Sequence, residues 1–144
     1  MIRLSCPHLV KAIDQYEDNG GIQKFNTLLQ QLDKPEGLDL SLNFLETNKA
    51  WQLIRMDALK DGDKEYIASY LGEEGAKHLM DSGIIGITAE KVDDVKCLHA
   101  HVADELLRGS NTIGKQTLEA LLNSGVDPSG CEGKSPVRAQ SVSG

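Results

Sequence analysis

The chain has 144 residues, of which 40% are hydrophobic, 26% are charged and 4% are aromatic, and its formal net charge is −7. This length suffices for one domain with its own core. No apolar run reaches the roughly 18–20 residues of a membrane span, and no apolar stretch near Met1 resembles a secretory signal. Acidic residues are spread without a basic stripe, which argues against binding to nucleic acid or to anionic lipid. We therefore expect a soluble protein of the cytosol or an organelle matrix.

Hydrophobic residues at helical spacing fill the first part of the chain. The first helix should follow Ser5, with Pro7 in its first turn, where the missing N–H costs nothing. It should end at Asn19-Gly20-Gly21. A second helix is predicted over residues 22–32, before the segment that contains Pro35. Both helices have one apolar face, so both predict core packing.

A third helix is predicted within residues 38–60, beginning at about Leu42, and it is apolar on two sides. One side carries Leu42, Leu45, Leu53 and Met56, and the nearly opposite side carries Phe44, Trp51 and Ala58. A helix of this kind is either sandwiched in the core or docked against another chain. Both interpretations stay open, and the second implies a protein partner bound through residues 42–60.

The second part of the chain predicts four more helices and one short strand. The helices are expected at residues 63–71, 73–81, about 93 to 108, and 112–123, and the best strand candidate is residues 84–88. If the chain has any sheet, Ile2–Leu4 is the partner of that strand. The sequence thus predicts a single, mainly α-helical domain over residues 1–124, of about six helices with at most a short two-stranded element. A flexible tail of Ser, Gly, Pro and polar residues is expected over residues 125–144.

Two short clusters hold five of the seven cysteine and histidine residues. The first is Cys6-Pro7-His8, and the second contains Cys97, His99 and His101. Three cysteines, an odd number in a reducing compartment, favour thiols or metal ligands over a disulfide framework. We expect the fold to bring the two clusters together on a metal ion.

A helix over residues 95–108 would divide the second cluster between two faces. Val95, Leu98, Val102 and Leu106 form the expected core stripe. His99 falls within that stripe, which favours a buried, hydrogen-bonded core histidine. Cys97 and His101 are one turn apart on the opposite face, where side chains lie roughly 5–6 Å from each other and can reach one ion.

A structural zinc ion takes four cysteine and histidine ligands, and a catalytic one takes three protein ligands and a water molecule. We predict a zinc site of Cys6, His8, Cys97 and His101, with Cys131 as a fifth or substitute ligand. If no metal is bound, these cysteines and histidines would be ordinary small buried residues near helix starts, because free cysteine is among the most buried residue types.

The leading functional hypothesis is a structural zinc site in a small binding or assembly module. One rival is a metal-dependent hydrolase, in which Asp104 or Glu105 would orient the water. The other is a metal-free thiol enzyme, with Cys97 as nucleophile and His101 as base. A closed four-ligand site without a pocket would favour the module, and an open position facing a cleft would favour the hydrolase. The substrate is not indicated.

Five short segments, taken in order along the chain, form a pattern that can be compared with known families. They are Ser5-Cys6-Pro7-His8-Leu9-Val10-Lys11, Tyr16-Glu17-Asp18-Asn19-Gly20-Gly21, Gly83-Ile84-Ile85-Gly86-Ile87, the run Val95-Lys96-Cys97-Leu98-His99-Ala100-His101-Val102-Ala103, and Asn111-Thr112-Ile113-Gly114. With these segments the sequence resembles the family catalogued as domain of unknown function 501, over about residues 4–115. The resemblance places Cys6, Cys97 and their histidines in one pattern and gives Cys131 a counterpart, but it implies no activity.

The sequence departs from that family at three places. Relatives usually carry an N-terminal segment, partly strand-like and with a further cysteine, ahead of the Cys-Pro pair, whereas here Met1 lies five residues before Cys6. The resemblance therefore implies a shortened N-terminus. Thr112 stands where relatives often have proline, and Ile85 where they often have glycine.

Overall fold

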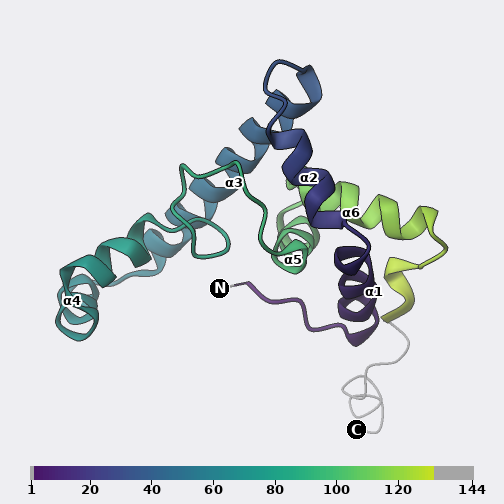
Figure 1. Cartoon of the computed structure of the whole chain (residues 1–144). Coiled ribbons are helices and arrows are strands. Elements are labelled where there is room, and N and C mark those ends of the chain that lie inside the picture. Colours follow the sequence, from purple (N-terminus) through teal and green to yellow (C-terminus); the bar gives the residue numbers. More distant parts are fainter. Residues whose placement is uncertain (1, 132–144) are drawn as a thin grey trace, which may run out of the picture.

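The computed structural model describes residues 2–131, which form six α-helices and one short 3-10 helix (Figure 1). The helices are α1 (Pro7–Asp18), α2 (Gly21–Leu29), α3 (Pro35–Ala58), α4 (Asp63–Asp81), α5 (Leu98–Arg108), α6 (Thr112–Asn123) and the 3-10 helix η1 (Pro128–Cys131). The mainly α-helical fold is confirmed. None of these helices is both long and apolar enough to cross a bilayer. The predicted domain boundary at residue 124 stays a prediction.

The strand predicted at residues 84–88 is wrong. Within residues 2–131 the only β-type pairing outside helices is an isolated bridge between Ser82 and Thr88. Gly86 between them has a φ of +77°, which belongs to a turn and not to a strand. The Asn48 side chain holds this turn, because it accepts from the Ile84 N–H at 3.1 Å and donates to the Ala89 carbonyl at 3.1 Å.

The core lies between α1, α2, the first half of α3, α5 and α6. Its largest fully buried hydrophobic side chains are Ile13, Phe25, Phe44, Leu98 and Ile113. Helices α5 and α6 form a tight hairpin, in which a Cβ atom added to Gly114 would lie 2.1 Å from the His101 carbonyl oxygen. Glycine is therefore required at this position for the two helices to approach so closely. Asn111 begins α6 by accepting a hydrogen bond from the Gly114 N–H at 2.9 Å.

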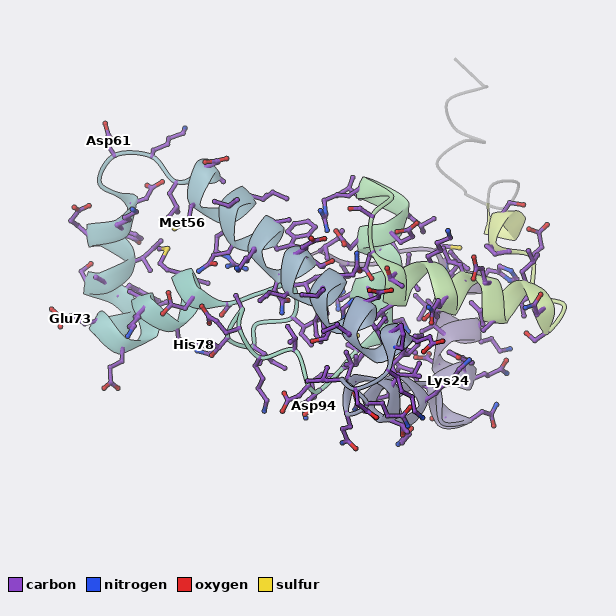
Figure 2. The ribbon with its side chains drawn as sticks, turned by 90° about the horizontal axis from the view of Figure 1, so that it is seen from above. Lys24, Met56, Asp61, Glu73, His78 and Asp94 are labelled. Atoms are coloured by element: carbon purple, nitrogen blue, oxygen red, sulfur yellow. The ribbon has the colours of Figure 1, made fainter. Side chains whose placement is uncertain are left out.

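Residues 53–81, which we call the arm, project away from this core. Figures 1 and 2 show the second half of α3 and all of α4 reaching outward, with Asp61 and Glu73 far from Lys24 in α2. No residue of α4 is buried, and Gly72 kinks the helix with a φ of 75° and a ψ of 168°. The rest of the molecule that the structure describes, residues 2–52 and 82–131, we call the body.

Helix α3 is not sandwiched along its length. It begins at Pro35, earlier than predicted, and buries Leu40, Phe44 and Thr47 in the body. Its other apolar side faces solvent, with Leu42 exposed by 51% and Leu53 by 63%. The sandwich interpretation is therefore wrong, because no second layer of the body covers that side.

Candidate metal centre

Three side chains from two helices converge where the end of α1 meets the start of α5. Glu17 lies in the last turn of α1, Cys97 directly precedes α5, and His99 lies in the first turn of α5. One ligand atom from each lies within 4.8 Å of the other two, and all three side chains are partly buried. Among residues 2–131, this is the one group of three or more such side chains that could hold a metal ion.

Hydrogen bonds from the backbone fix the arrangement. The Leu98 N–H donates to Glu17 Oε1 at 2.8 Å. Cys97, the N-cap residue of α5, makes no side-chain cap of its own, so the carboxylate from α1 satisfies this helix end. Upstream, Asn26 accepts from the Val95 N–H at 2.6 Å and fixes the chain that leads into Cys97. The position of the group therefore depends on contacts between residues far apart in the sequence.

The orientation of His99 indicates which ring nitrogen is available as a ligand. Its Nε2 lies 3.3 Å from the Val10 carbonyl oxygen and 3.1 Å from Asp14 Oδ1. Both oxygens accept hydrogen bonds and lie closer than the Glu17 oxygen at Nδ1, which favours the tautomer with its proton on Nε2. In that tautomer the lone pair of Nδ1 faces Cys97 and Glu17. Metal-bound histidines typically donate their other N–H to a carboxylate or a backbone carbonyl in this way.

The distances between these atoms match those of a zinc site. Zinc binds sulfur at about 2.3 Å and nitrogen or oxygen at about 2.0–2.2 Å, so tetrahedral geometry places sulfur and nitrogen ~3.5 Å apart and nitrogen and oxygen ~3.4 Å apart. Cys97 Sγ lies 3.8 Å from His99 Nδ1, and Glu17 Oε1 lies 3.5 Å from the same nitrogen. Small side-chain movements therefore suffice for all three atoms to bind one ion.

A cavity of about 410 Å³ borders the group, and both Cys97 and His99 line it. The other lining residues are Ile2, Arg3, Leu4, Val10, Ile85, Lys96 and Ala100. The volume is in the range of small-molecule binding sites, about 300–1,000 Å³. Two of the three candidate ligands are thus accessible to a small molecule.

Of the residues predicted as ligands, the structure places only Cys97 in this group. Cys97 is a free thiol, whereas Cys6 is disulfide-bonded, which the odd number of cysteines did not predict. His8 lies on the surface with Nε2 2.8 Å from the Asp127 carbonyl oxygen. The side chain of Cys131 lies outside the described residues. A zinc site of Cys6, His8, Cys97 and His101 stays a prediction whose ligand atoms this structure does not bring together.

The prediction of a core His99 and of a His101 on the more polar face with Cys97 is wrong, because the structure shows the reverse burial. His101 is fully buried, and its ring contacts Phe44 edge-to-face with centroids 5.0 Å apart. His99 is the histidine at the partly exposed group. His101 is buried because Phe44 of α3 and Asn111 before α6 cover its side of α5. In addition, α5 begins at Leu98, and Cys97 before it is extended, with φ −152° and ψ 114°. One-turn spacing applies only inside a helix, so Cys97 and His101 do not share a face.

His101 instead belongs to a buried polar network. Its Nδ1 lies 3.1 Å from Asn111 Nδ2, which also donates to Asp104 Oδ2 at 2.9 Å. Burial lowers the pKa of His101 to about 4, so the ring is neutral near pH 7. Its Nε2 has no hydrogen-bond partner among residues 2–131. The network joins α5 to α6 and has no direct connection to Cys97.

The carboxylates expected to orient a water molecule also have structural roles. Burial alone would raise the pKa of Asp104, but hydrogen bonds from Arg108, Asn111 and Trp51 outweigh it and hold that pKa below its ordinary value. Trp51 Nε1 donates to Asp104 at 2.7 Å, which ties α3 to α5. Glu105 accepts from the Asn111 N–H at 2.6 Å. Neither carboxylate is one of the three candidate ligands.

Glu17 and Asp14 are the functional candidates that the sequence did not reveal. Their spacing carries a weak signal, because Val10, Asp14 and Glu17 are four and three residues apart and so lie on one face of α1. That pattern is also typical of an ordinary solvent-exposed helix face. Only the packing of α1 against α5 shows that this face meets His99.

The comparison with protein families gives one result. The model of the family described as "Protein of unknown function (DUF501)" matches residues 1–119. The chain belongs to this family. The match covers α1 through α5 and most of α6, and so includes Glu17, Cys97 and His99. No curated protein and no solved structure gives a significant match to the chain.

Proposed function

We propose that this DUF501 protein binds a zinc ion through Glu17, Cys97 and His99, and that the ion activates water for hydrolysis. A thiolate with an imidazole suits zinc, whereas calcium and magnesium prefer oxygen ligands alone. The observation that carries the proposal is that ligand atoms of three different side chains lie within 4.8 Å of one another beside a cavity. Zinc with three protein ligands and an exchangeable position lowers the pKa of water to about 7.

Two features favour this proposal over a purely structural zinc site. A closed site needs a fourth protein ligand, and among the side chains that the structure describes, residues 2–130, the group offers three. The cavity provides space for a substrate next to two of the ligands. An ion at this position would also join the end of α1 to the start of α5, so it would stabilise the fold as well.

The first test is metal analysis of the purified full-length protein and three variants. We expect about one equivalent of zinc in the wild type and its loss in Cys97→Ala and His99→Ala. His8→Ala is the matched control, because His8 belongs to the alternative ligand set and lies on the surface, so we expect it to keep its zinc. Loss of zinc in His8→Ala but not in His99→Ala would establish the alternative set. A wild type without metal would contradict both.

A second test separates an open site from a closed one. Cobalt(II) substituted for zinc has a visible spectrum that reports thiolate ligation and coordination number. We expect acetohydroxamate, a small chelating anion, to change that spectrum by entering the exchangeable position. An unchanged spectrum at saturating acetohydroxamate would indicate a closed, structural site.

A thiol enzyme is the second candidate, and one chain of contacts favours it. Cys97 Sγ lies 3.8 Å from His99 Nδ1, and His99 Nε2 lies 3.1 Å from Asp14 Oδ1, an order of thiol, base and carboxylate that is typical of cysteine nucleophiles. For this candidate we expect iodoacetamide to alkylate Cys97 rapidly without chelator treatment, and His99→Ala to slow the reaction. Slow alkylation that accelerates only after zinc removal would exclude it.

We further propose that the arm binds a protein partner. Its exposed side chains include Leu53, Ile54, Tyr66, Tyr70 and Leu71, and α4 buries none of its residues. The test is amide exchange of the labelled chain in an extract of the cells that produce it, compared with buffer. Protection confined to residues 53–81 would support the proposal, and equal exchange rates in both media would contradict it.

A further inference from the structure

The cavity beside the candidate metal centre has a property that metal binding does not explain. Its wall is mainly apolar, but two cationic side chains, Arg3 and Lys96, also line it. A site that held only a metal ion would need neither an apolar wall nor cations near its ligands. An apolar cavity with a few polar groups is typical of a small-molecule site.

The two cations differ in their partners. Lys96 Nζ pairs with Asp94, and the hydrogen bond from Lys96 is the main reason that the pKa of Asp94 lies below its ordinary value. Arg3 makes no hydrogen bond or ion pair with any residue from 2 to 131. An unpaired guanidinium is notable in a chain whose net charge is −7, since acidic partners are abundant. Its planar set of N–H donors matches the two oxygens of a carboxylate.

We infer that the cavity binds a small molecule with an apolar body and a carboxylate group, and that the carboxylate pairs with Arg3. The apolar body lies against the wall formed by Ile2, Leu4, Val10 and Ile85. A molecule in this cavity would lie beside Cys97 and His99. Its role as the substrate therefore rests on the proposed function. Its binding through Arg3 does not depend on the metal.

The test uses three probes with the same seven-carbon apolar chain: octanoate, heptyl phosphate and heptanol. Calorimetric titration of the wild type should show octanoate binding about two- to fivefold more tightly than heptanol, the gain expected from one exposed ion pair. Arg3→Gln should remove that difference. Lys96→Gln is the matched control and should retain it, because Lys96 is already paired with Asp94. Both side chains are exposed, so neither variant should affect folding.

Three results would overturn the inference. Equal affinities of octanoate and heptanol in the wild type would show that no anion is recognised. An unchanged preference in Arg3→Gln would show that Arg3 is not the recognising group. Tighter binding of heptyl phosphate than of octanoate would assign the site to phosphate esters.

Metal removal distinguishes failure of this inference from failure of the proposed function. We expect chelator-treated wild type to keep its Arg3-dependent preference for octanoate. If removal of the metal abolishes octanoate binding and Arg3→Gln has no effect, the carboxylate binds the ion; the inference then fails and the metal site stands. If the purified protein contains no metal but the Arg3-dependent preference persists, the proposed function fails and the carboxylate site stands.

Discussion

The body and the arm use the same kind of amphipathic helix with opposite results. In the body, apolar faces meet across α1, α2, α5 and α6, and side chains such as Phe25 and Phe44 are fully buried. The arm has no buried residue, yet it carries half of the exposed large hydrophobic side chains among residues 2–131. Helix α3 passes through both regions (Figure 1). An apolar stripe therefore indicates that a helix can pack against another surface. It does not show that the surface belongs to the same chain.

This difference also separates metal binding from partner binding. The body holds the candidate metal centre, because only packed helices can fix ligand atoms from α1 and α5 to within a few tenths of an ångström. The arm has few contacts that fix it; Arg55 is one, donating to the Ser82 and Gly83 carbonyls at 2.7 and 3.2 Å. We therefore expect substitutions in the body to change global stability and metal binding, and substitutions in the arm to change neither.

The largest expected contrast is between two aromatic residues. Phe44 is 2% exposed and Tyr70 is 80% exposed. Phe44→Ala should lower the free energy of unfolding by about 3–5 kcal/mol, because it opens a cavity in the core. Tyr70→Ala should change it by less than about 0.5 kcal/mol. Urea unfolding followed by circular dichroism measures both. Similar losses in the two variants would mean that the arm is packed as tightly as the body.

The buried His101 predicts a pH dependence that belongs to the body alone. Its pKa is 6.5 in the unfolded chain and is lowered to about 4 in the folded one by burial. Between these values the unfolded chain binds a proton that the folded chain does not. Stability is therefore full above pH 6.5 and falls as the pH is lowered toward 4, by roughly 3 kcal/mol over the window. Urea midpoints measured at several pH values should show this fall.

Two controls isolate the contribution of His101. His101→Phe should flatten the pH dependence in this window, although it costs stability at every pH because Asn111 loses an acceptor. His78→Gln changes an exposed residue of the arm and should leave the pH dependence unchanged. Asp104 acts in the same direction, because its pKa is also lowered in the folded chain, but its effect lies mainly below its ordinary pKa of 3.8, outside the window. A fall in stability that persists in His101→Phe would assign the effect to other groups.

Local signals made much of the body predictable from the sequence. Pro7 and the Gly20-Gly21 pair set the bounds of α1, and Gly109 set the end of α5, because each acts on its own turn of backbone. The start of α5 was misplaced because residues 93–97 satisfy a helical pattern but are held extended by contacts elsewhere, such as that of Asn26 with Val95. The periodicity of a sequence does not reveal a contact between residues that lie far apart in the chain.

The candidate site was predictable only in part. Cys97 belongs to both the predicted and the observed group, because cysteine is informative by residue type alone. The exchange of His99 for His101 follows from tertiary packing, because Phe44 of α3 and Asn111 at the start of α6 cover the side of α5 that carries His101. Glu17 lies 80 positions from Cys97, and nothing local distinguishes it from the other acidic residues of the chain. Identifying it required the packing of α1 on α5.

A smaller effect is expected where α5 and α6 touch. Gly114→Ala would place a Cβ atom 2.1 Å from the His101 carbonyl oxygen, so the two helices must move apart. We expect a loss of about 1–3 kcal/mol in the free energy of unfolding, the range for overpacking a core contact. Thermal denaturation should show a lower midpoint for this variant. An unchanged midpoint would mean that the hairpin is more loosely packed than the structure shows.

The smallest expected effect concerns Gly75 in the arm, and it tests whether the arm unfolds separately from the body. A Cβ atom added there would meet only the Cβ atom of Leu71, at 3.0 Å, and the non-helical Gly72 between the two residues lets the backbone shift by the few tenths of an ångström required. Gly75→Ala should stabilise α4 by at most about 1 kcal/mol, because alanine has the higher helix propensity. Amide exchange should slow within residues 63–81 by up to about fivefold. The thermal midpoint of the whole protein should not move, because opening of the arm exposes nothing in the core. If the midpoint rises instead, the arm and the body unfold as one cooperative unit, and the contrast between them is confined to the folded state.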